Sequence, residues 1–326
     1  MIVVSKDAPH LNERTLFEAV QDQAPFDGVA QRIKMEKSGS FDASHLSLTC
    51  VPRTLTIAGS DSSGGAGIQA DIKTFQECGA YGMSVVTAIT SQNTYGVRNV
   101  HPIPLEHITS QIDAVQEDIV PDAVKTGMLV DELTIRIISD RMRTYGWSNV
   151  VVDPVMIAKG GSTLLSISAI DTLRRELLPL TTIVTPNIPE AEALAEMRIH
   201  TFEDRIQAAE RIHANGVQYV YIKGGHDNKL STCDDLLYDG YTTWWFSSER
   251  RITPHTHGTG CTLSAAMAAF LAGGASVAQA VFHAKQFVYA AISEPLEIGH
   301  GQGPVNHWAH RQRYAKEGDH DKQNNE

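Results

Sequence analysis

The segment His255-Thr256-His257-Gly258-Thr259-Gly260-Cys261 carries the strongest chemical signal in the sequence, and an apolar run with helical spacing follows it directly. Gly258 and Gly260 leave the backbone open to close approach. If a helix begins at residues 259–261, its first N–H groups lack acceptors within the helix, and its positive end favours phosphate or a developing negative oxygen. Cys261 would lie in the same field, which lowers the pKa of a thiol. The pattern predicts an anion site beside a reactive thiol; the alternative is an ordinary Gly-rich turn before a packed helix.

A second Gly-rich loop follows a buried-strand pattern at residues 54–60. It reads Asp61-Ser62-Ser63-Gly64-Gly65-Ala66-Gly67, and a helical pattern that ends at Gly79 comes directly after it. A strand, a Gly-rich turn and a helix in this order are typical of a ligand-binding βα loop. The spacing matches neither the dinucleotide fingerprint nor a P-loop, since no Gly-Lys-Ser/Thr follows. We expect the two Gly-rich loops to form two sides of one cleft.

Polar residues also follow the other predicted strands, and ligands of parallel sheets bind at the carboxyl ends of the strands. Asp153 and Glu190 could hold a magnesium ion, directly or through water. Lys223 could neutralise phosphate charge, and the 258–261 turn could hold the oxygens of a transferred group, so the set offers what phosphoryl transfer requires. Each residue taken singly has a second interpretation, because strand-end Asp and Asn commonly cap helices or turn the chain. The polar segments are 59–61, 90–94, 125–128, 153–155, 185–190 and 223–226.

Alternating apolar runs and helical patterns indicate the elements that must position these side chains. From Thr54 onward the alternation predicts an α/β fold, with a mainly parallel central sheet and helices on both faces. Asp239-Gly240 predicts a hairpin within 234–247 that adds antiparallel strands at a sheet edge. The predicted strands are 54–58, 85–90, 123–126, 149–153, 182–185 and 218–222, and the predicted helices are 66–78, 105–118, 131–145, 167–178, 188–197, 203–215, 260–272 and 276–293.

Composition narrows the class of protein. The chain has 326 residues, of which 42% are hydrophobic, and a formal net charge of −11. These values are ordinary for a globular protein and disfavour a nucleic-acid or anionic-membrane binder. The sequence shows no membrane-spanning apolar stretch and no signal-peptide pattern. The cysteines are scattered without zinc-site spacing, which favours a reducing cytoplasm.

The two ends of the chain differ from its middle. Residues 1–52 are polar and aperiodic, so we interpret them as an appended, partly disordered extension. The domain is predicted at 53–310, and 311–326 reads as a charged tail.

Six segments, taken together and in order, resemble one enzyme family. From about residue 54 to about residue 308 the chain resembles the hydroxymethylpyrimidine/phosphomethylpyrimidine kinases of thiamine biosynthesis, which belong to the ribokinase-like superfamily. Residues 1–52 lie outside the resemblance. The segments are Gly59-Ser60-Asp61-Ser62-Ser63-Gly64-Gly65-Ala66-Gly67-Ile68-Gln69-Ala70-Asp71, Ser91-Gln92-Asn93-Thr94, Lys125-Thr126-Gly127-Met128-Leu129, Thr185-Pro186-Asn187-Ile188-Pro189-Glu190-Ala191, Lys223-Gly224-Gly225-His226 and the 255–261 turn.

The resemblance implies a kinase that uses ATP and magnesium. It would phosphorylate 4-amino-5-hydroxymethyl-2-methylpyrimidine and then convert the monophosphate to the diphosphate. Gln92 would pair with the aminopyrimidine edge, because its amide offers a donor and an acceptor that complement an amine beside a ring nitrogen. Gly59, Asp71 and Met128 would line the same pocket. Without the resemblance, Asp71 reads as a helix-surface carboxylate and Met128 as a core side chain.

The resemblance also assigns the phosphate side of the site. Gly258, Gly260 and Cys261 would form the anion hole, and many ribokinase-like kinases carry Asp where this family and this chain carry Cys261. Cys261 would act as the base, although a thiol must first lose its proton. The remaining implied roles are binding of ATP by Lys223 and Thr259, binding of Mg²⁺ by Asp153 and Glu190, and a cytoplasmic homodimer.

Two other functions stay open from the sequence. A pyridoxal or pyridoxine kinase belongs to the same superfamily, but Gln92 argues against it, since the pyridine alcohol lacks the pair of amine and ring nitrogen. A non-catalytic ligand-binding protein on a kinase fold is disfavoured by the intact set of Asp153, Glu190, Lys223 and Cys261. His255 and His257 alone are weak grounds for a metal site, because such sites need several convergent ligands.

Overall fold

The computed structural model describes residues 2–6, 51–156, 165–226 and 231–312. Its centre is a ten-stranded sheet in the order β1-β10-β9-β8-β7-β6-β5-β2-β3-β4. The strands from β8 to β3 run parallel to one another, whereas β1, β9, β10 and β4 pair antiparallel at the two edges. The strands are β1 Ile2–Ser5, β2 Arg53–Asp61, β3 Tyr81–Asn93, β4 Gly96–Pro102, β5 Ala123–Thr126, β6 Val150–Val152, β7 Ile183–Val184, β8 Tyr219–Ile222, β9 Thr232–Tyr238 and β10 Thr243–Glu249.

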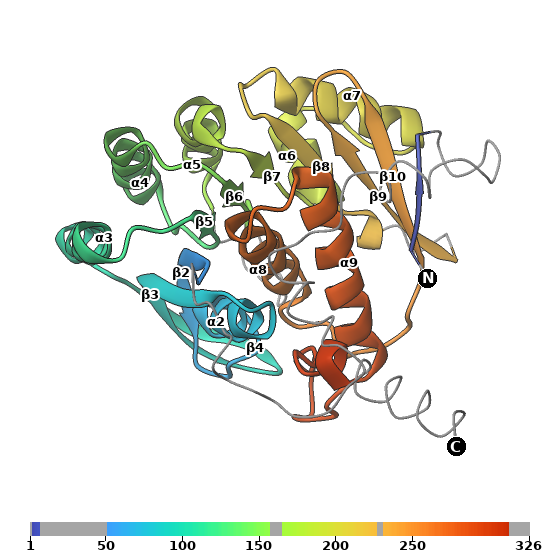
Figure 1. Cartoon of the computed structure of the whole chain (residues 1–326), viewed down its shortest axis with the longest axis horizontal. Coiled ribbons are helices and arrows are strands. Elements are labelled where there is room, and N and C mark those ends of the chain that lie inside the picture. The colour runs from blue at the N-terminus through green and yellow to red at the C-terminus, as the bar shows by residue number, and fades with distance from the viewer. Residues whose placement is uncertain (1, 7–50, 157–164, 227–230, 313–326) are drawn as a thin grey trace, which may run out of the picture.

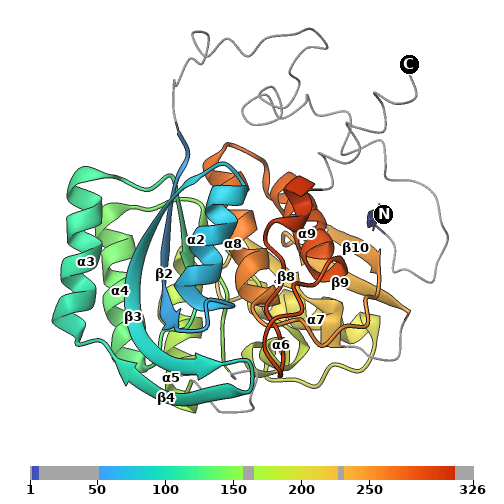
Figure 2. The ribbon, with the colours of Figure 1, turned by 90° about the horizontal axis from the view of Figure 1, so that it is seen from below.

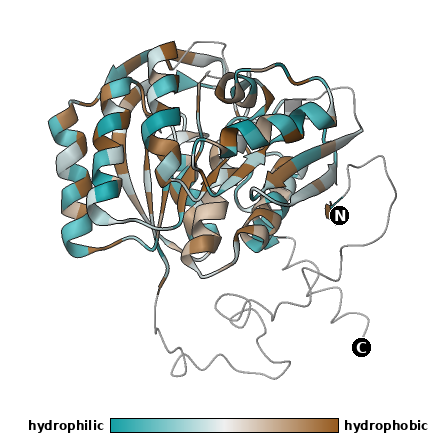
Figure 3. Cartoon of the chain, turned by 90° about the horizontal axis from the view of Figure 1, so that it is seen from above, coloured by the Kyte–Doolittle hydropathy of each residue, from teal (hydrophilic) through white to brown (hydrophobic). Residues whose placement is uncertain are grey.

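Helices cover both faces of the sheet (Figure 1). α2 (Gly67–Glu77), α8 (Thr259–Ala272) and α9 (Val277–Ser293) lie on one face. The helices on the other face are α3 Leu105–Asp118, α4 Glu132–Tyr145, α5 Ile167–Thr172, α6 Ile188–Ala195 and α7 Phe202–His213. Hydropathy follows these layers in Figure 3, where the strands are largely hydrophobic and the helices carry hydrophilic residues on their outer sides.

The pleat of the strands explains why two helical layers are needed. In β6, Val150 and Val152 belong to the core under α3–α7, whereas Val151 between them belongs to the core under α2, α8 and α9. In β8, Val220 likewise belongs to the core under α3–α7, and Tyr221 belongs to the core under α2, α8 and α9. Successive side chains point to opposite faces, so a strand that is apolar at every position must be covered on both sides. The all-apolar runs in the sequence therefore fix the three-layer architecture.

Two strands were not predicted. β4 is a mostly exposed edge strand with a polar composition, so it lacks the apolar run that marked the other strands. β1 comes from the segment that we interpreted as an appended extension; it pairs with β10 and buries Ile2 and Val4. Residues 7–50 of the predicted extension lie outside the described residues. Among the helices of the described ranges, none has the length and apolarity needed to span a lipid bilayer.

Deleting residues 1–52 should reduce stability without reducing turnover. β1 lies at the sheet edge beyond β10, away from the strands whose ends carry the predicted site. Loss of Ile2 and Val4 should lower the free energy of unfolding by about 1.5–3 kcal/mol for each side chain, as measured by denaturant titration. Val4→Asp should reproduce part of this loss and Val3→Asp should not, because Val4 is 8% exposed and Val3 is 51% exposed. Loss of turnover in the deletion would show that the segment also supports the site.

Candidate active site

The two Gly-rich loops meet at the carboxyl ends of the parallel strands. They begin α2 and α8, two helices that pack side by side (Figure 2). Gly258 has a φ of +83°, and a Cβ placed on it would overlap the carbonyl oxygen of Gly65. The backbone of Gly67 in the first loop also lies close enough to Cys261 to favour its thiolate, which lowers the pKa of that thiol. The two loops were expected to form two sides of one cleft; in the structure they lie together and touch at Gly65 and Gly258.

The first turn of α8 has the free N–H groups that the predicted anion site requires. The helix begins at Thr259 with Gly258 as its N-cap, so the N–H groups of Gly260 and Cys261 belong to the turn that has no intrahelical acceptors. A Cβ on Gly260 would lie 3.4 Å from Asp153 Oδ2 and 3.5 Å from Lys223 Nζ. The helix start thus lies next to the predicted carboxylate and lysine. The hydroxyl of Thr259, which was predicted to bind ATP, donates a hydrogen bond to the carbonyl of residue 256 at 2.7 Å. In this structure it therefore stabilises the turn.

Cys261 differs from the sequence-based expectation in one respect. Burial raises the pKa of its thiol to about 11, with Asp71 and Asp153 acting in the same direction, and Lys125 opposes the rise. The prediction that the helix start lowers this pKa was wrong, because loss of hydration outweighs the helix field. Cys261 is therefore a thiol at neutral pH.

A buried ion pair lies beneath Cys261. Lys125 on β5 and Asp71 on α2 have no exposed surface, and Lys125 Nζ lies 2.8 Å from Asp71 Oδ2. Thr56 donates to the same oxygen at 2.6 Å. Burial opposes the charge on Lys125, but Asp71, Cys261 and Asp153 together raise its pKa, so the lysine stays charged. Asp71 was expected to line the substrate pocket; in this conformation its carboxylate instead faces Lys125 and Thr56.

Asp153, Glu190 and Lys223 form a second charged cluster. Lys223 Nζ lies 2.9 Å from Asp153 Oδ1 and 3.8 Å from Glu190 Oε2. Glu190 also accepts a hydrogen bond from the backbone of Asn187. It therefore takes part in capping α6, a structural role of the kind that the sequence analysis gave as the alternative for strand-end polar residues. Burial and the charge of Asp153 raise the pKa of Glu190 to about 7, against the pull of Lys223. A partly protonated carboxyl next to a carboxylate is a place where added positive charge is favourable.

Gln92, Gly59 and Met128 lie on neighbouring strand ends. Gln92 is half-buried near the end of β3. A Cβ on Gly59 would lie 2.5 Å from the terminal methyl of Met128, so this side chain covers the glycine. Met128 is also held through its carbonyl, which accepts from Thr87 at 2.7 Å. The three residues that were predicted to share a substrate pocket with Asp71 thus come from adjacent elements.

Asp61 and His257 organise the junction of the loops, and the sequence analysis gave neither of them a role. Asp61 Oδ2 lies 2.8 Å from His257 Nε2 and accepts from the backbone of Ala66 at 2.8 Å, while Oδ1 accepts from Ser63. Burial alone would raise the pKa of Asp61, but these hydrogen bonds lower it to about 2. Asp61 is therefore ionised and joins the first Gly-rich loop to the second. An Asp at position 1 of a Gly-rich loop is the signal that could have found it.

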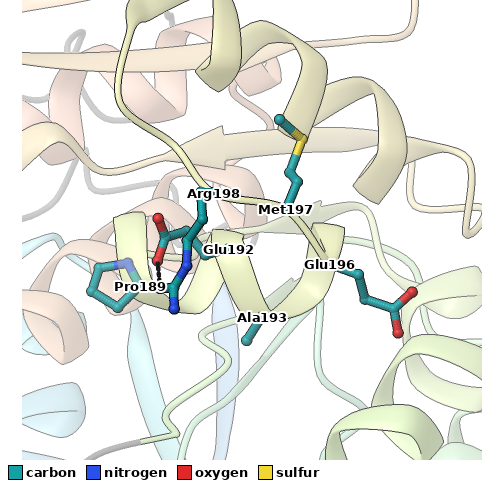
Figure 4. Close-up of a pocket in the computed structure, with 6 residues that line it drawn as sticks. All are labelled: Pro189, Glu192, Ala193, Glu196, Met197 and Arg198. Carbon is teal, nitrogen blue, oxygen red and sulfur yellow. Dashed lines mark hydrogen bonds and ion pairs between the residues drawn. The ribbon is translucent and has the colours of Figure 1, made fainter.

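Within the described residues, no three His, Cys, Asp or Glu side chains form a group that could hold a metal ion. A separate hollow lies on the surface of α6, where Arg198 pairs with Glu192 at 3.1 Å (Figure 4). None of the predicted site residues lines it. The lining residues are Pro189, Glu192, Ala193, Glu196, Met197 and Arg198.

Known proteins resemble this chain over most of its length. The sequence profile of the family described as phosphomethylpyrimidine kinase matches residues 61–306. The hydroxymethylpyrimidine/phosphomethylpyrimidine kinase of Bacillus subtilis (strain 168) is 51% identical over 257 residues, which cover 79% of this chain and 95% of that protein.

Solved structures show the same fold. An ADP complex of Bacillus subtilis pyridoxal kinase matches with a TM-score of 0.76 and 45% identity over 80% of this chain and 99% of that one. The phosphomethylpyrimidine kinase of Clostridium difficile 630 matches with a TM-score of 0.67 and 44% identity over 74% of this chain and 99% of that one. With its ribokinase-like sheet and its two joined Gly-rich loops, this chain belongs to the phosphomethylpyrimidine kinase family.

Proposed function

We propose that this protein phosphorylates 4-amino-5-hydroxymethyl-2-methylpyrimidine, and then the monophosphate, with ATP as the phosphoryl donor, in thiamine biosynthesis. The observation that carries the proposal is the first turn of α8, with Cys261 and Gly260 next to Lys223 and Asp153. Helix N–H groups and a lysine at one point stabilise the charge that develops on a transferred phosphoryl group. The family relationship and the ADP complex of the similar pyridoxal kinase support ATP as the donor.

In this proposal the substrate lies between the strand ends and the turn. Gln92 pairs with the amine and the neighbouring ring nitrogen, while Gly59 and Met128 cover the ring. Asp71 acts from below by holding Lys125, whose charge favours the thiolate of Cys261 over the thiol. Gly258 and Gly260 leave room for the phosphoryl oxygens, and Lys223 and Thr259 contact ATP.

Asp153 and Glu190 would hold a magnesium ion. Two carboxylates are a common protein contribution to such a site, in which water and phosphate supply the other oxygens. The raised pKa of Glu190 beside Asp153 also fits a site that gains a cation, since burial and the like charge both penalise its carboxylate. When bound, the ion would neutralise phosphate charge, while Lys223 and the start of α8 orient the transferred group.

A homodimer in the cytoplasm completes the proposal. In the described residues β4 is one of the two edge strands of the sheet, and Tyr95 before it is 71% exposed. An exposed edge strand offers unpaired backbone N–H and C=O groups to a second subunit.

Pyridoxal phosphorylation is the second candidate, because the first solved structure described above is a pyridoxal kinase. A coupled ADP-release assay on a panel of pyrimidine and pyridine alcohols separates the two functions. We expect the largest kcat/KM for the aminopyrimidine alcohol. A larger value for pyridoxal would reverse the order of the candidates, and the absence of turnover with any alcohol would exclude both.

Gln92→Leu should weaken binding of the aminopyrimidine without unfolding the protein. Leucine preserves the apolar volume but leaves the amine and the ring nitrogen unpaired, which costs roughly 2–4 kcal/mol, or about 30–1000-fold in KM. KM for ATP should stay the same. The exposed neighbour Ser91 supplies the matched control, because Ser91→Ala should change neither constant. An unchanged KM for the pyrimidine in Gln92→Leu would contradict the assignment.

A further inference from the structure

The side-chain amide of Gln92 lies between two hydrogen-bonding partners. Its Nε2 is 3.2 Å from Nε2 of His257, and its Oε1 is 3.3 Å from Oγ1 of Thr90. His257 Nε2 also lies 2.8 Å from Asp61 Oδ2, and the Thr90 hydroxyl lies 2.9 Å from the carbonyl oxygen of Ser60. Four side chains thus form a chain of contacts: Asp61, His257, Gln92 and Thr90. They connect the first Gly-rich loop, the second Gly-rich loop and the end of β3.

Only one assignment of donors and acceptors is possible along these contacts. Asp61 is an ionised acceptor, since its hydrogen bonds lower its pKa to about 2. The short contact to Asp61 therefore requires that His257 Nε2 carries a proton. A protonated Nε2 cannot accept from an amide nitrogen, so Gln92 Nε2 and His257 Nε2 would be two donors facing each other.

The other end of the amide leads to the same conclusion. Thr90 has a single hydroxyl proton, and the Ser60 carbonyl is its closer acceptor. The Thr90 oxygen then offers only lone pairs toward Gln92, which requires a donor there. Rotating the amide by 180° removes both mismatches, because the oxygen and the nitrogen of a carboxamide occupy nearly identical positions. The single Nε2 proton of His257 is then shared in a bifurcated hydrogen bond, mainly with Asp61 at 2.8 Å and more weakly with the Gln92 oxygen at 3.2 Å.

We propose that Asp61 and His257, together with Thr90, are positioning residues that fix the Gln92 amide with Oε1 toward His257 and Nε2 toward Thr90. Each amide atom keeps a second hydrogen-bonding site, since the oxygen has two lone pairs and the nitrogen two N–H groups. The amine of the substrate then meets the His257 side of Gln92, and its ring nitrogen meets the Thr90 side. This inference rests on the proposed function, in which Gln92 reads the aminopyrimidine edge.

A locked amide discriminates between two ligands of the same shape. In the 4-oxo counterpart of the aminopyrimidine alcohol, an acceptor replaces the amine and an N–H replaces the ring nitrogen, so the hydrogen-bond pattern is inverted. A free Gln92 could rotate to match either pattern, whereas a fixed one places like groups against each other. A site built around specific hydrogen bonds rejects the mismatched analogue by large factors, and we expect a ratio of oxo to amino Kd of about 10² or more in the native protein.

The test is calorimetric titration of both alcohols into the full chain without ATP, which measures binding apart from chemistry. His257→Phe keeps a ring against Gly65 but removes the donor, and Thr90→Val keeps the shape but removes the oxygen. Each should reduce the Kd ratio to below about 10. His257→Gln should restore the ratio, because its amide nitrogen can donate to Asp61 and to Gln92 together. His255→Phe in the same turn is the matched control and should leave the ratio unchanged.

The outcomes separate this inference from the proposed function. A ratio that stays near the native value in His257→Phe and Thr90→Val overturns the fixed amide, and so does a native protein that binds both alcohols equally; the kinase function then still stands. If His257→Phe does not fold, the Thr90→Val ratio alone decides. A native protein that binds neither alcohol overturns the proposed function itself.

Discussion

Replacing Cys261 with alanine is expected to lower kcat by about 10²–10⁴-fold and to leave ATP binding largely intact. In our proposal the thiolate accepts the proton of the substrate hydroxyl while that oxygen attacks the γ-phosphate, and general-base help contributes a factor of this size. Because burial raises the pKa of this thiol to about 11, only about one molecule in 10⁴ carries the thiolate at pH 7. The kcat of the native enzyme should therefore rise with pH between 7 and 10. The alanine variant should lose this rise.

Two further variants test whether the loss in Cys261→Ala comes from the missing base. Cys261→Asp should retain partial activity with a flatter pH profile, since a carboxylate is ionised throughout this range and fills the same place in relatives of the superfamily. Cys78→Ala is the matched control, because Cys78 is a buried cysteine at the end of α2, in the core under α8 and α9. It should change stability but not kcat. Full activity in Cys261→Ala would move catalysis to phosphate positioning by Gly258, Gly260 and Lys223.

Gly258→Ala is expected to lower kcat/KM by about 10²–10³-fold, the usual cost of losing one donor from an oxyanion site. The methyl group would overlap the carbonyl of Gly65, and neither backbone can yield without separating the two loops. The start of α8 would then shift relative to Asp153 and Lys223. Steady-state kinetics with each substrate would measure the loss, and it should appear in kcat as well as in KM.

Gly274→Ala separates this steric effect from backbone strain. Gly274 has a φ of +89°, close to that of Gly258, but a Cβ there would meet no atom within 4 Å. A left-handed alanine costs roughly 1–2 kcal/mol, so both variants should lose some stability. Only Gly258→Ala should lose activity. Equal kinetic losses in the two variants would show that strain, and not the contact between the loops, is responsible.

The sequence predicted the parallel strands, most helices and the antiparallel hairpin at Asp239-Gly240, because these elements have apolar patterns of a single period. The structure and the solved relatives confirm the ribokinase-like α/β fold. β1 and β4 escaped prediction for opposite reasons. β4 is too exposed to carry an apolar pattern, and β1 has one but is too short and too far along the chain from its partner β10.

The sequence nominated residues for the site, but it did not show which of their side chains contact one another. Motif order identified Cys261, Lys223 and Gln92, whereas the pairing of Asp71 with Lys125 joins side chains 54 positions apart and depends on which face of α2 meets β5. The pKa of Cys261 was misjudged because burial is a property of the folded chain. The roles of individual site residues remain predictions that the variants above will test.

The contact between Gly65 and Gly258 also limits when the protein can fold during its synthesis. These residues are separated by 258 − 65 = 193 positions. At about 5–20 residues per second, a ribosome that has made the first loop needs about 10–40 s to reach the second. A nascent chain therefore carries the first Gly-rich loop without its partner for more than half of its synthesis, and in our proposal phosphoryl transfer requires that α8 has docked beside α2. Enzyme activity in a translation extract thus reports the completion of the fold.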